Sequence, residues 1–220
     1  MTRSLFAFAS VLLMGAVLAG FAGPREDAAP TPASSATLSE VATWSLDQAH
    51  SRVGFKVKHL GISTVRGAFS EYDGTVRFDP ADLSTLSART TVQVASIDTE
   101  NERRDNHLRS ADFFAADEFP AMTFVSKRVQ NIEGDRFELV GDLTIRGTTK
   151  EVVFDGEFLG VAAMGESERA GFEASTTIDR LDYGLAWDRL TEAGGLVVSH
   201  DVTIVLELQL RKETPQTDAD

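Results

Sequence analysis

The side chains best suited to bind a metal ion are the four histidines, at His50, His59, His107 and His200. A protein metal site needs three or four ligands that converge on one point. None of the histidines follows another at the short spacings typical of ligand pairs on one helix or strand. Asp105 and His107 are close together, but they stand in a charged stretch typical of a solvated surface. The sequence therefore predicts neither a metal site nor a cofactor.

Asp47, His50 and Ser51 have the residue types of a hydrolase triad. They are too close in sequence to converge as triad residues do on most scaffolds. The chain has no Gly-x-Ser-x-Gly segment around a nucleophile, no phosphate-binding loop and no cysteine. We therefore expect no catalytic residue. His50 and Ser51 are expected to form hydrogen bonds with the backbone at the start of a strand.

The chain is acidic, with a formal net charge of -13 over 220 residues. Such a charge repels the phosphates of nucleic acids and of anionic lipid surfaces, so the sequence favours neither as a partner. A hydrophobic share of 42% in a chain of this length is sufficient for one domain with a substantial core.

The N-terminus has the pattern of a secretion signal. A basic residue precedes an apolar stretch over residues 5–18, and small residues follow up to Ala22. The stretch is shorter than the roughly 20 residues of a membrane-spanning helix, and Phe21 stands where a lipoprotein would have its lipidated cysteine. The sequence therefore predicts a signal peptide over residues 1–22 and a periplasmic or extracellular protein, with no stable membrane insertion after cleavage.

One patterned region spans residues 43–211. It lies between a Pro/Ala/Ser/Thr-rich segment at residues 23–42, interpreted as a flexible linker, and a polar tail at residues 212–220, expected to be disordered. Within it, apolar and polar side chains alternate as in half-buried β-strands, most clearly around Val202 and Ile204. Evenly spaced strands without intervening helices predict an all-β sandwich or barrel of about eight strands.

One helical stretch interrupts the strands, over residues 101–111. It is short and charged, so we expect an excursion on the rim of the barrel. Phe113, Phe114, Phe119 and Phe124 follow it, and they form either ordinary core or a cap that closes one end of an apolar cavity.

Four glycines interrupt the apolar alternation, at Gly54, Gly67, Gly141 and Gly156. Glycine inside a strand often marks a bend or the close approach of a ligand. We interpret these glycines first as corners of the barrel and second as space for a ligand.

Several short motifs occur in a fixed order between Trp44 and Leu210. They are Trp44-Ser45-Leu46-Asp47 with His50-Ser51, Val57-Lys58-His59-Leu60-Gly61, Val65-Arg66-Gly67 with Phe69, Ser96-Ile97-Asp98-Thr99, Arg104-Asp105 with His107-Leu108-Arg109-Ser110, Asp112-Phe113-Phe114, Phe119-Pro120 with Met122-Thr123-Phe124, Gly141-Asp142-Leu143-Thr144-Ile145-Arg146-Gly147 and Arg180-Leu181-Asp182-Tyr183-Gly184. In order and spacing this set resembles the YceI-like family of exported, lipocalin-like proteins.

The resemblance implies a single eight-stranded antiparallel lipocalin-like β-barrel with an elongated apolar cavity. It also implies a bound polyisoprenoid chain, such as a ubiquinone-type molecule or a precursor, held in the periplasm for transport, storage or stress response. The family has no single shared reaction. The alternatives are a filled barrel that acts through its surface as a stress or interaction protein, and a hydrolase or metal protein. A homodimer is left open.

The period-two pattern supplies the candidate cavity wall. Its apolar residues are Val53, Phe55, Val57, Phe69, Phe78, Val92, Val94, Phe113, Phe114, Phe124, Leu143, Phe154, Phe172 and Ile204. A polar head group would need only one or two partners at the mouth, and the candidates are His59, Arg66, Arg146 and Arg180. Each of these also suits a structural pairing, above all Arg180 with Asp182.

Cleavage of the N-terminus is the first testable prediction. N-terminal sequencing of the protein from fractionated cells is expected to begin at Gly23, because the small residues at Gly20 and Ala22 suit a signal peptidase. A mature protein that retains Met1 would contradict the prediction.

Overall fold

The computed structural model describes residues 40–165, 167–190 and 196–214. The expected signal peptide, most of the expected linker and the tail after residue 214 lie outside these ranges. Within the described ranges, no helix is long and apolar enough to cross a membrane.

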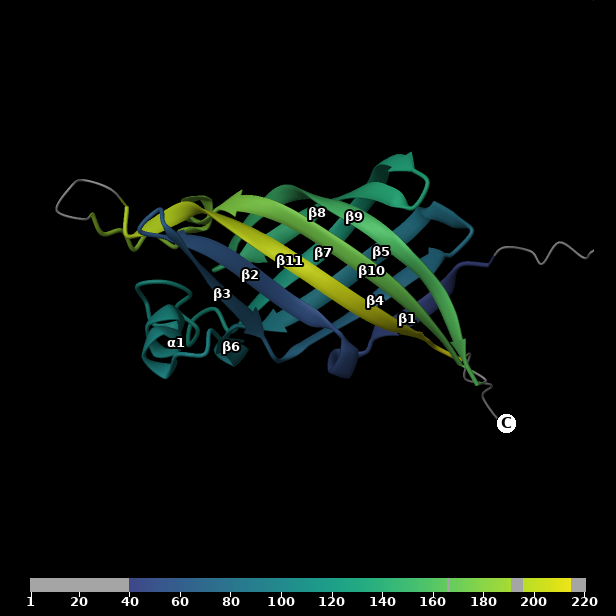
Figure 1. Cartoon of the computed structure of the whole chain (residues 1–220), viewed down its shortest axis with the longest axis horizontal. Helices are drawn as coiled ribbons and strands as arrows, with labels where there is room; N and C mark the ends of the chain where they lie inside the picture. The colour runs from purple at the N-terminus through teal and green to yellow at the C-terminus, as the bar shows by residue number, and fades with distance from the viewer. Residues whose placement is uncertain (1–39, 166, 191–195, 215–220) are drawn as a thin grey trace, which may run out of the picture. The chain divides into compact units, whose positions relative to one another are not determined.

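A single antiparallel sheet of eleven strand segments forms the fold (Figure 1). The order of the segments is β1-β4-β5-β7-β8-β9-β10-β11-β2-β3-β6, and β1 also pairs with β11, which closes the sheet into a barrel. The segments are β1 (Ala42–Leu46), β2 (Arg52–His59), β3 (Ser63–Phe69), β4 (Tyr72–Asp79), β5 (Asp82–Gln93), β6 (Ile97–Asp98), β7 (Ala121–Glu133), β8 (Arg136–Ile145), β9 (Thr148–Met164), β10 (Ser167–Asp179) and β11 (Val198–Lys212).

Three strands of the barrel are each broken into two segments, so the eleven segments correspond to eight strands. The turn η1 (Gln48–His50) separates β1 from β2, the pair Ser70-Glu71 separates β3 from β4, and η2 (Val94–Ser96) separates β5 from β6. The halves keep their neighbours, since β2 pairs with β3 and β1 with β4. In the same way β6 pairs with β3 and β5 with β4. The expected all-β, eight-stranded antiparallel barrel is therefore confirmed.

Hydrogen bonds join the three breaks to one another. The backbone N–H of Ser70 donates to the carbonyl of Ser96 (3.2 Å), and that of Glu71 donates to the hydroxyl of Ser96 (3.0 Å). The side-chain amide of Gln48 donates to the carbonyl of Tyr72 (2.5 Å). The strands therefore bend at one level of the barrel while backbone groups at the bend keep their partners.

The strand register separates inner from outer faces. Val202 on β11 lies between Val57 on β2 and Ile178 on β10. All three side chains face the interior. The next residue, Thr203, pairs with Lys56 and lies on the outer face. The alternation in the sequence thus follows the inside and outside of the barrel.

Three of the four strand glycines lie beneath phenyl rings. A β-carbon at Gly67 would be 2.5 Å from the ring of Phe55, and one at Gly141 would be 2.5 Å from the ring of Phe124. Gly156 is covered by a third ring in the same way, at 2.6 Å. The interpretation of these glycines as space for a ligand is wrong, because neighbouring aromatic side chains already occupy that space.

An aromatic cluster fills the end of the barrel at which β1 and β11 pair. Trp44 and Phe78 have 0% of their surface exposed, and their rings are 5.1 Å apart. Phe172 lies 5.1 Å from Phe78 and 5.0 Å from Phe158. We call Trp44, Phe78, Phe158 and Phe172 the aromatic plug. Its packed side chains close this end of the barrel.

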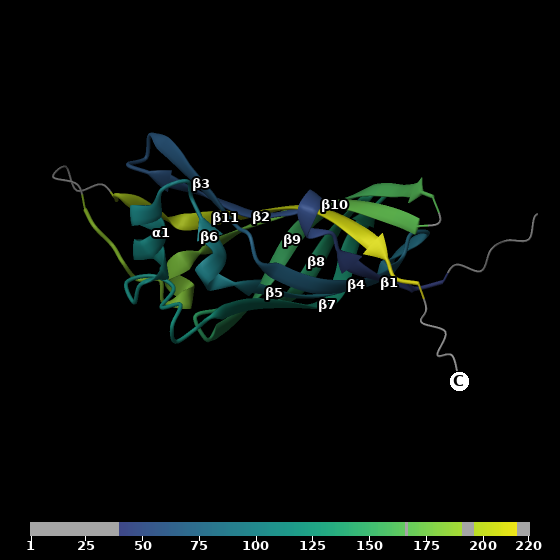
Figure 2. The ribbon, with the colours of Figure 1, turned by 90° about the horizontal axis from the view of Figure 1, so that it is seen from below.

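The expected short helix is present as α1 (Glu102–Arg109), at the opposite end of the barrel (Figures 1 and 2). The side chain of Asn101 caps it by accepting from the N–H of Arg104. Asp105 is buried and accepts a hydrogen bond from the N–H of Thr99 (3.0 Å). Arg109 donates to the carbonyl of Ile97 (2.8 Å). These bonds fasten the helix to β6 and fix its place at the rim.

The segment of the chain that forms the barrel begins one residue earlier and ends one residue later than the sequence indicated. Ala42 pairs with Phe78, so it belongs to β1 and not to the linker. Lys212 pairs with Trp44, so it belongs to β11 and not to the tail. Pairing partners from distant segments extend strands beyond their alternating pattern.

Adjacent substitutions on β11 test the register. Val202→Asp places an unpaired carboxylate in an apolar interior and is expected to lower the free energy of unfolding by several kcal/mol. Thr203→Asp is expected to change it by about 0.5 kcal/mol or less, because that side chain faces outward. Urea unfolding of both variants measures the difference, and equal effects would show that the register is wrong.

Candidate ligand-binding cavity

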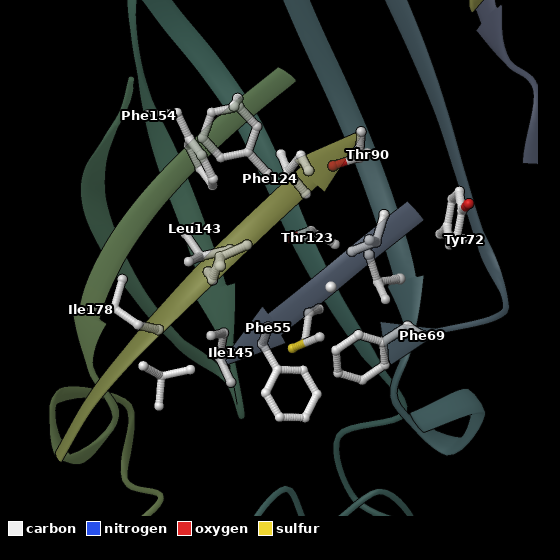
Figure 3. Close-up of a pocket in the computed structure, with 18 of the residues that line it drawn as sticks. Phe55, Phe69, Tyr72, Thr90, Thr123, Phe124, Leu143, Ile145, Phe154 and Ile178 are labelled. Carbon is white, nitrogen blue, oxygen red and sulfur yellow. The ribbon is translucent and has the colours of Figure 1, made fainter. Parts of the chain in front are cut away.

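An apolar cavity runs along the barrel interior between the aromatic plug and α1. Figure 3 shows part of its wall, including Phe55, Phe124 and Phe154. The volume of the cavity is about 220 Å³. Only Tyr72, Thr90, Thr123 and Arg180 among its lining residues have a polar side-chain atom, and the rest are aliphatic, aromatic, methionine or glycine. Such a wall excludes a polar ligand and suits a hydrocarbon one.

Most of the apolar residues expected in the cavity wall lie in it. Phe78 and Val94 do not, and they correct the expectation: Phe78 belongs to the aromatic plug, and Val94 is buried in η2, where the strand is broken. Alternation identifies the side of a strand but not the depth along the barrel. The residues that do line the cavity are Val53, Phe55, Val57, Phe69, Val92, Phe113, Phe114, Phe124, Leu143, Phe154, Phe172 and Ile204.

Other wall residues were missed by the sequence reasoning. Met122, Ile145 and Ala174 each lie two positions from a recognised wall residue on the same strand, so the period-two pattern had the signal to find them. Thr90 lies two positions from Val92 in the same way, but its hydroxyl concealed the signal, as did that of Tyr72. The hydroxyl of Tyr72 donates to the carbonyl of Ser51 (2.7 Å). This hydrogen bond offsets the free-energy cost of burying the hydroxyl in an apolar wall.

Aromatic rings cover the α1 end of the cavity. The ring of Phe114 packs edge-on against Phe69, with centroids 6.1 Å apart. Phe113 lies 5.3 Å from Trp187 and 5.1 Å from the ring of His107. Trp187 was not expected here, because it follows the last recognised motif. Phe113 and Phe114 thus form the expected cap.

Two residues of the expected cap lie elsewhere. Phe124 packs against Phe154 at 5.2 Å, deeper in the cavity wall. The ring of Phe119 lies where a β-carbon of Gly147 would be, at the turn between β8 and β9. Proximity in sequence to Phe113 was a poor guide, because β7 carries Phe124 down the barrel.

Among the described residues, Arg180 is the one charged residue in the cavity wall, with 3% of its surface exposed. Its guanidinium donates to the carbonyls of Leu185, Ser199 (3.0 Å) and Val198 (3.4 Å). The nearest carboxylate is that of Asp188, at 3.9 Å. Burial lowers the pKa of Arg180, and the charge of Asp188 opposes that shift.

The expected ion pair between Arg180 and Asp182 is wrong. Asp182 lies 3.5 Å from Lys150 instead. Arg180 and Asp182 belong to the turn η3 (Arg180–Tyr183), where Arg180 is buried and Asp182 is exposed. Closeness in sequence therefore does not bring the two charges together.

The other basic candidates for a head-group partner lie outside the cavity wall. Arg66 is exposed on the outer face of β3, and His59 is half-buried at the end of β2. Arg146 donates to the carbonyls of Phe113 (2.7 Å) and Gly184 (2.9 Å). Arg146 therefore holds the cap in place from its outer side.

Asp47, His50 and Ser51 lie together but do not form a triad. His50 is 3.2 Å from Asp47, whereas the hydroxyl of Ser51 bonds to the backbone of Gln209 (2.9 and 3.1 Å). Burial raises the pKa of Asp47, but the hydrogen bonds from His50 and Gln209 and the charge of His50 lower it below its ordinary value overall. The expected backbone bonding of Ser51 is confirmed. Within the described ranges, no three His, Asp or Glu side chains are grouped to hold a metal ion.

The closed barrel, its plugged end and its apolar interior define a class of small barrels that enclose an apolar cavity. The profile of the YceI-like domain matches residues 44–210. The chain belongs to the YceI-like family.

Individual relatives agree with this assignment. The UPF0312 protein SAS2572 of Staphylococcus aureus is 44% identical over 161 residues, which cover 72% of this chain and 91% of that protein. The crystal structure of the Campylobacter jejuni YCEI protein is similar, with a TM-score of 0.64, 38% identity, and coverage of 77% of this chain and 97% of that one. A polyisoprenoid binding domain from Saccharophagus degradans shares the fold, with a TM-score of 0.57, 18% identity, and coverage of 79% and 100%.

Tyr183 gives a prediction about pH. Its hydroxyl is buried and has no hydrogen-bond partner among the described residues, and burial raises its pKa to about 12. A group whose pKa is raised by folding stabilises the protein below its unfolded pKa, about 10 for tyrosine, and loses that contribution as the pH rises through the folded value.

The free energy of unfolding is therefore expected to fall between pH 10 and 12, by an amount on the order of 2 kcal/mol for Tyr183. In Tyr183→Phe this part of the loss should be absent, and the stability at pH 7 should be little changed because no bond is removed. Urea unfolding at several pH values tests both statements. An unchanged pH dependence in the variant would contradict them.

Proposed function

We propose that the protein binds the hydrocarbon chain of a polyisoprenoid, such as a ubiquinone-type molecule or its precursor, inside the barrel. The observation that carries the proposal is the apolar cavity closed at one end by the aromatic plug. Each buried methylene contributes about 0.8 kcal/mol, so a chain of several isoprene units would bind without polar partners along its length. The Saccharophagus degradans domain that shares the fold is described as a polyisoprenoid binding domain, which supports the same kind of ligand here.

The direction of the chain follows from the closed end. A polar head group cannot lie against the plug without losing its hydrogen bonds to water. We therefore propose that the head group lies at the α1 end, where Arg180 is the one charged wall residue among those the structure describes. A guanidinium has five N–H donors. Bonds to the carbonyls of Leu185, Ser199 and Val198 use three of them, which leaves donors for an oxygen of a quinone or an alcohol.

The proposal assigns a binding role and no reaction. The triad-like residues bond to one another and to the backbone, outside the cavity wall. Binding would serve transport, storage or a response to stress. The proposed site of action is the periplasm, for which the pattern of a secretion signal ahead of Ala22 is the support.

Lipid extraction tests the proposal directly. Protein purified from cells that make isoprenoid quinones is expected to yield a polyisoprenoid on organic extraction and mass spectrometry. Lipid-free protein is expected to melt at a higher temperature after addition of a polyprenol in mild detergent, because a ligand that binds only the folded state stabilises it. If no lipid is extracted and no shift occurs, the barrel acts through its surface instead.

Filling the cavity provides a matched pair of variants. Ala174 lines the cavity on β10, and Ser175, its neighbour, lies on the outer face opposite Val205. Ala174→Phe is expected to lower polyprenol affinity at least tenfold while the fold is kept, because the new ring occupies ligand volume. Ser175→Phe is expected to leave the affinity unchanged. Equal affinities in the two variants would show that the ligand binds elsewhere.

A further inference from the structure

Three exposed aliphatic side chains gather at the end of the barrel that carries α1. Ile62 is 87% exposed, Leu190 65% and Leu60 43%. Leu60 and Ile62 lie in the turn between β2 and β3, and Leu190 lies in the segment ahead of β11. The N–H of Leu60 donates to the carbonyl of Val197 (2.9 Å), and the N–H of Val197 donates to the carbonyl of Arg189 (2.9 Å), which joins the two segments. We call Leu60, Ile62 and Leu190 the apolar tip.

A group of cations adjoins the apolar tip. Lys56 and Lys58 on β2 and Arg66 on β3 lie on the outer face of this hairpin, and we call them the basic strip. Lys56 and Arg66 are direct partners in the strand register. Like charges opposite each other destabilise a sheet. No ion pair joins any of the three to a carboxylate of the described residues. The unfavourable pairing therefore has no ion pair among the described residues to offset it, and it suits an external anion.

The nearby carboxylates do not cancel this charge by contact. Asp179 and Asp201 are partners of one another across β10 and β11, on the outer face next to β2. Asp188 lies within 4 Å of Arg180 and His200. At an ionic strength of about 0.1 M, charges more than about 10 Å from a surface are largely screened, so the local cations decide the interaction.

The apolar tip is continuous with the cavity wall. Val198, a wall residue, is the register partner of His59, which directly precedes Leu60. The other end of the barrel is closed by the aromatic plug, so we expect an apolar ligand to enter at this end, past the cap formed by Phe113 and Phe114. The turn between β2 and β3 lies at the same end as α1 in both views of the ribbon (Figures 1 and 2).

We propose that this end of the barrel docks on the surface of an anionic lipid bilayer. The apolar tip inserts into the interfacial region, and the basic strip contacts the lipid phosphates. Exposed aliphatic side chains with neighbouring cations are the combination that binds such a surface. Docking brings the capped end of the cavity, opposite the aromatic plug, to the medium in which isoprenoid chains dissolve. The docking itself does not require the proposed ligand, so the two proposals fail separately.

Vesicle sedimentation of the purified protein measures the docking. We expect binding to vesicles of equal parts phosphatidylglycerol and phosphatidylethanolamine at 0.1 M salt, and much weaker binding to phosphatidylcholine. Because each cation near an anionic surface contributes roughly fivefold to partitioning, Lys56→Glu with Arg66→Glu should reduce binding at least 25-fold. Ile62→Asp should reduce it at least tenfold. Salt at about 1 M should weaken the wild type toward the level of the charge variant.

Matched controls lie at the other end of the barrel. Leu159 on β9 is 57% exposed, so Leu159→Asp removes a comparable apolar side chain away from the tip. Arg77 on β4 is exposed and has no ion pair among the described residues, so Arg77→Glu makes a comparable change of charge. Both controls should bind vesicles as the wild type does. Thermal melting of all variants should be similar, because the substituted side chains are exposed.

Three results would overturn the inference. The first is the absence of sedimentation with the anionic vesicles. The second is a loss of binding that is equal in Ile62→Asp and Leu159→Asp. The third is a dimer in sedimentation equilibrium that Ile62→Asp dissociates, since the tip would then contact a second copy of the chain. A wild type that sediments with vesicles but shows no thermal shift with polyprenol would contradict the proposed ligand and leave the docking intact.

Discussion

The pairing of β1 with β11 is the constraint on which the rest of the structure depends. It is short, from Trp44 opposite Lys212 to Leu46 opposite Leu210, yet it turns a sheet with two edges into a closed barrel. Closure creates an interior, and the inward side chains then have nowhere to face but one another. On its other side β1 pairs with β4, which brings Trp44 into contact with Phe78 and so builds the plug that closes one end.

The broken strands explain why the other end is not filled in the same way. Below the breaks, β1, β4 and β5 pair closely and their side chains form the aromatic plug and its surroundings. Above the breaks, β2 pairs with β11, β3 with β2 and β6 with β3, and this part of the sheet ends next to α1. The bend therefore separates a packed region from a hollow one within a single sheet. A cavity in a barrel of eight strands is possible because the inward side chains of the upper region do not meet at the centre.

Much of the fold could be predicted because period-two alternation is a local property of the chain. It indicated the strand type and the inward side of residues such as Ile204 and Phe154, whereas the eight-stranded barrel was implied by the resemblance to the YceI-like family. It could not give the depth of a residue along the barrel, which depends on partners far away in sequence. Phe78 was therefore placed in the cavity wall, although its pairing with Ala42 carries it into the plug.

The predictions for the strand glycines and for the buried Arg180 were wrong for the same reason. The ring that covers Gly67 comes from Phe55 on the neighbouring strand, and a sequence alone does not show which ring lies over which glycine. Arg180 was matched to an acid two residues away, whereas its nearest carboxylate, on Asp188, belongs to a later loop. Ion pairs between exposed neighbours contribute little, so their closeness in sequence carries little information.

Net charge shows the same contrast between a whole-chain property and a local one. A charge of -13 argues against binding along a nucleic acid, because such a surface must be matched over many phosphates. It does not decide what one end of the barrel contacts, because screening limits each carboxylate to its own neighbourhood. Lys56 and Arg66 face each other on a hairpin where no carboxylate of the described residues pairs with them. In an acidic protein, a local excess of positive charge beside exposed aliphatic side chains is therefore the part of the surface most specific for a partner.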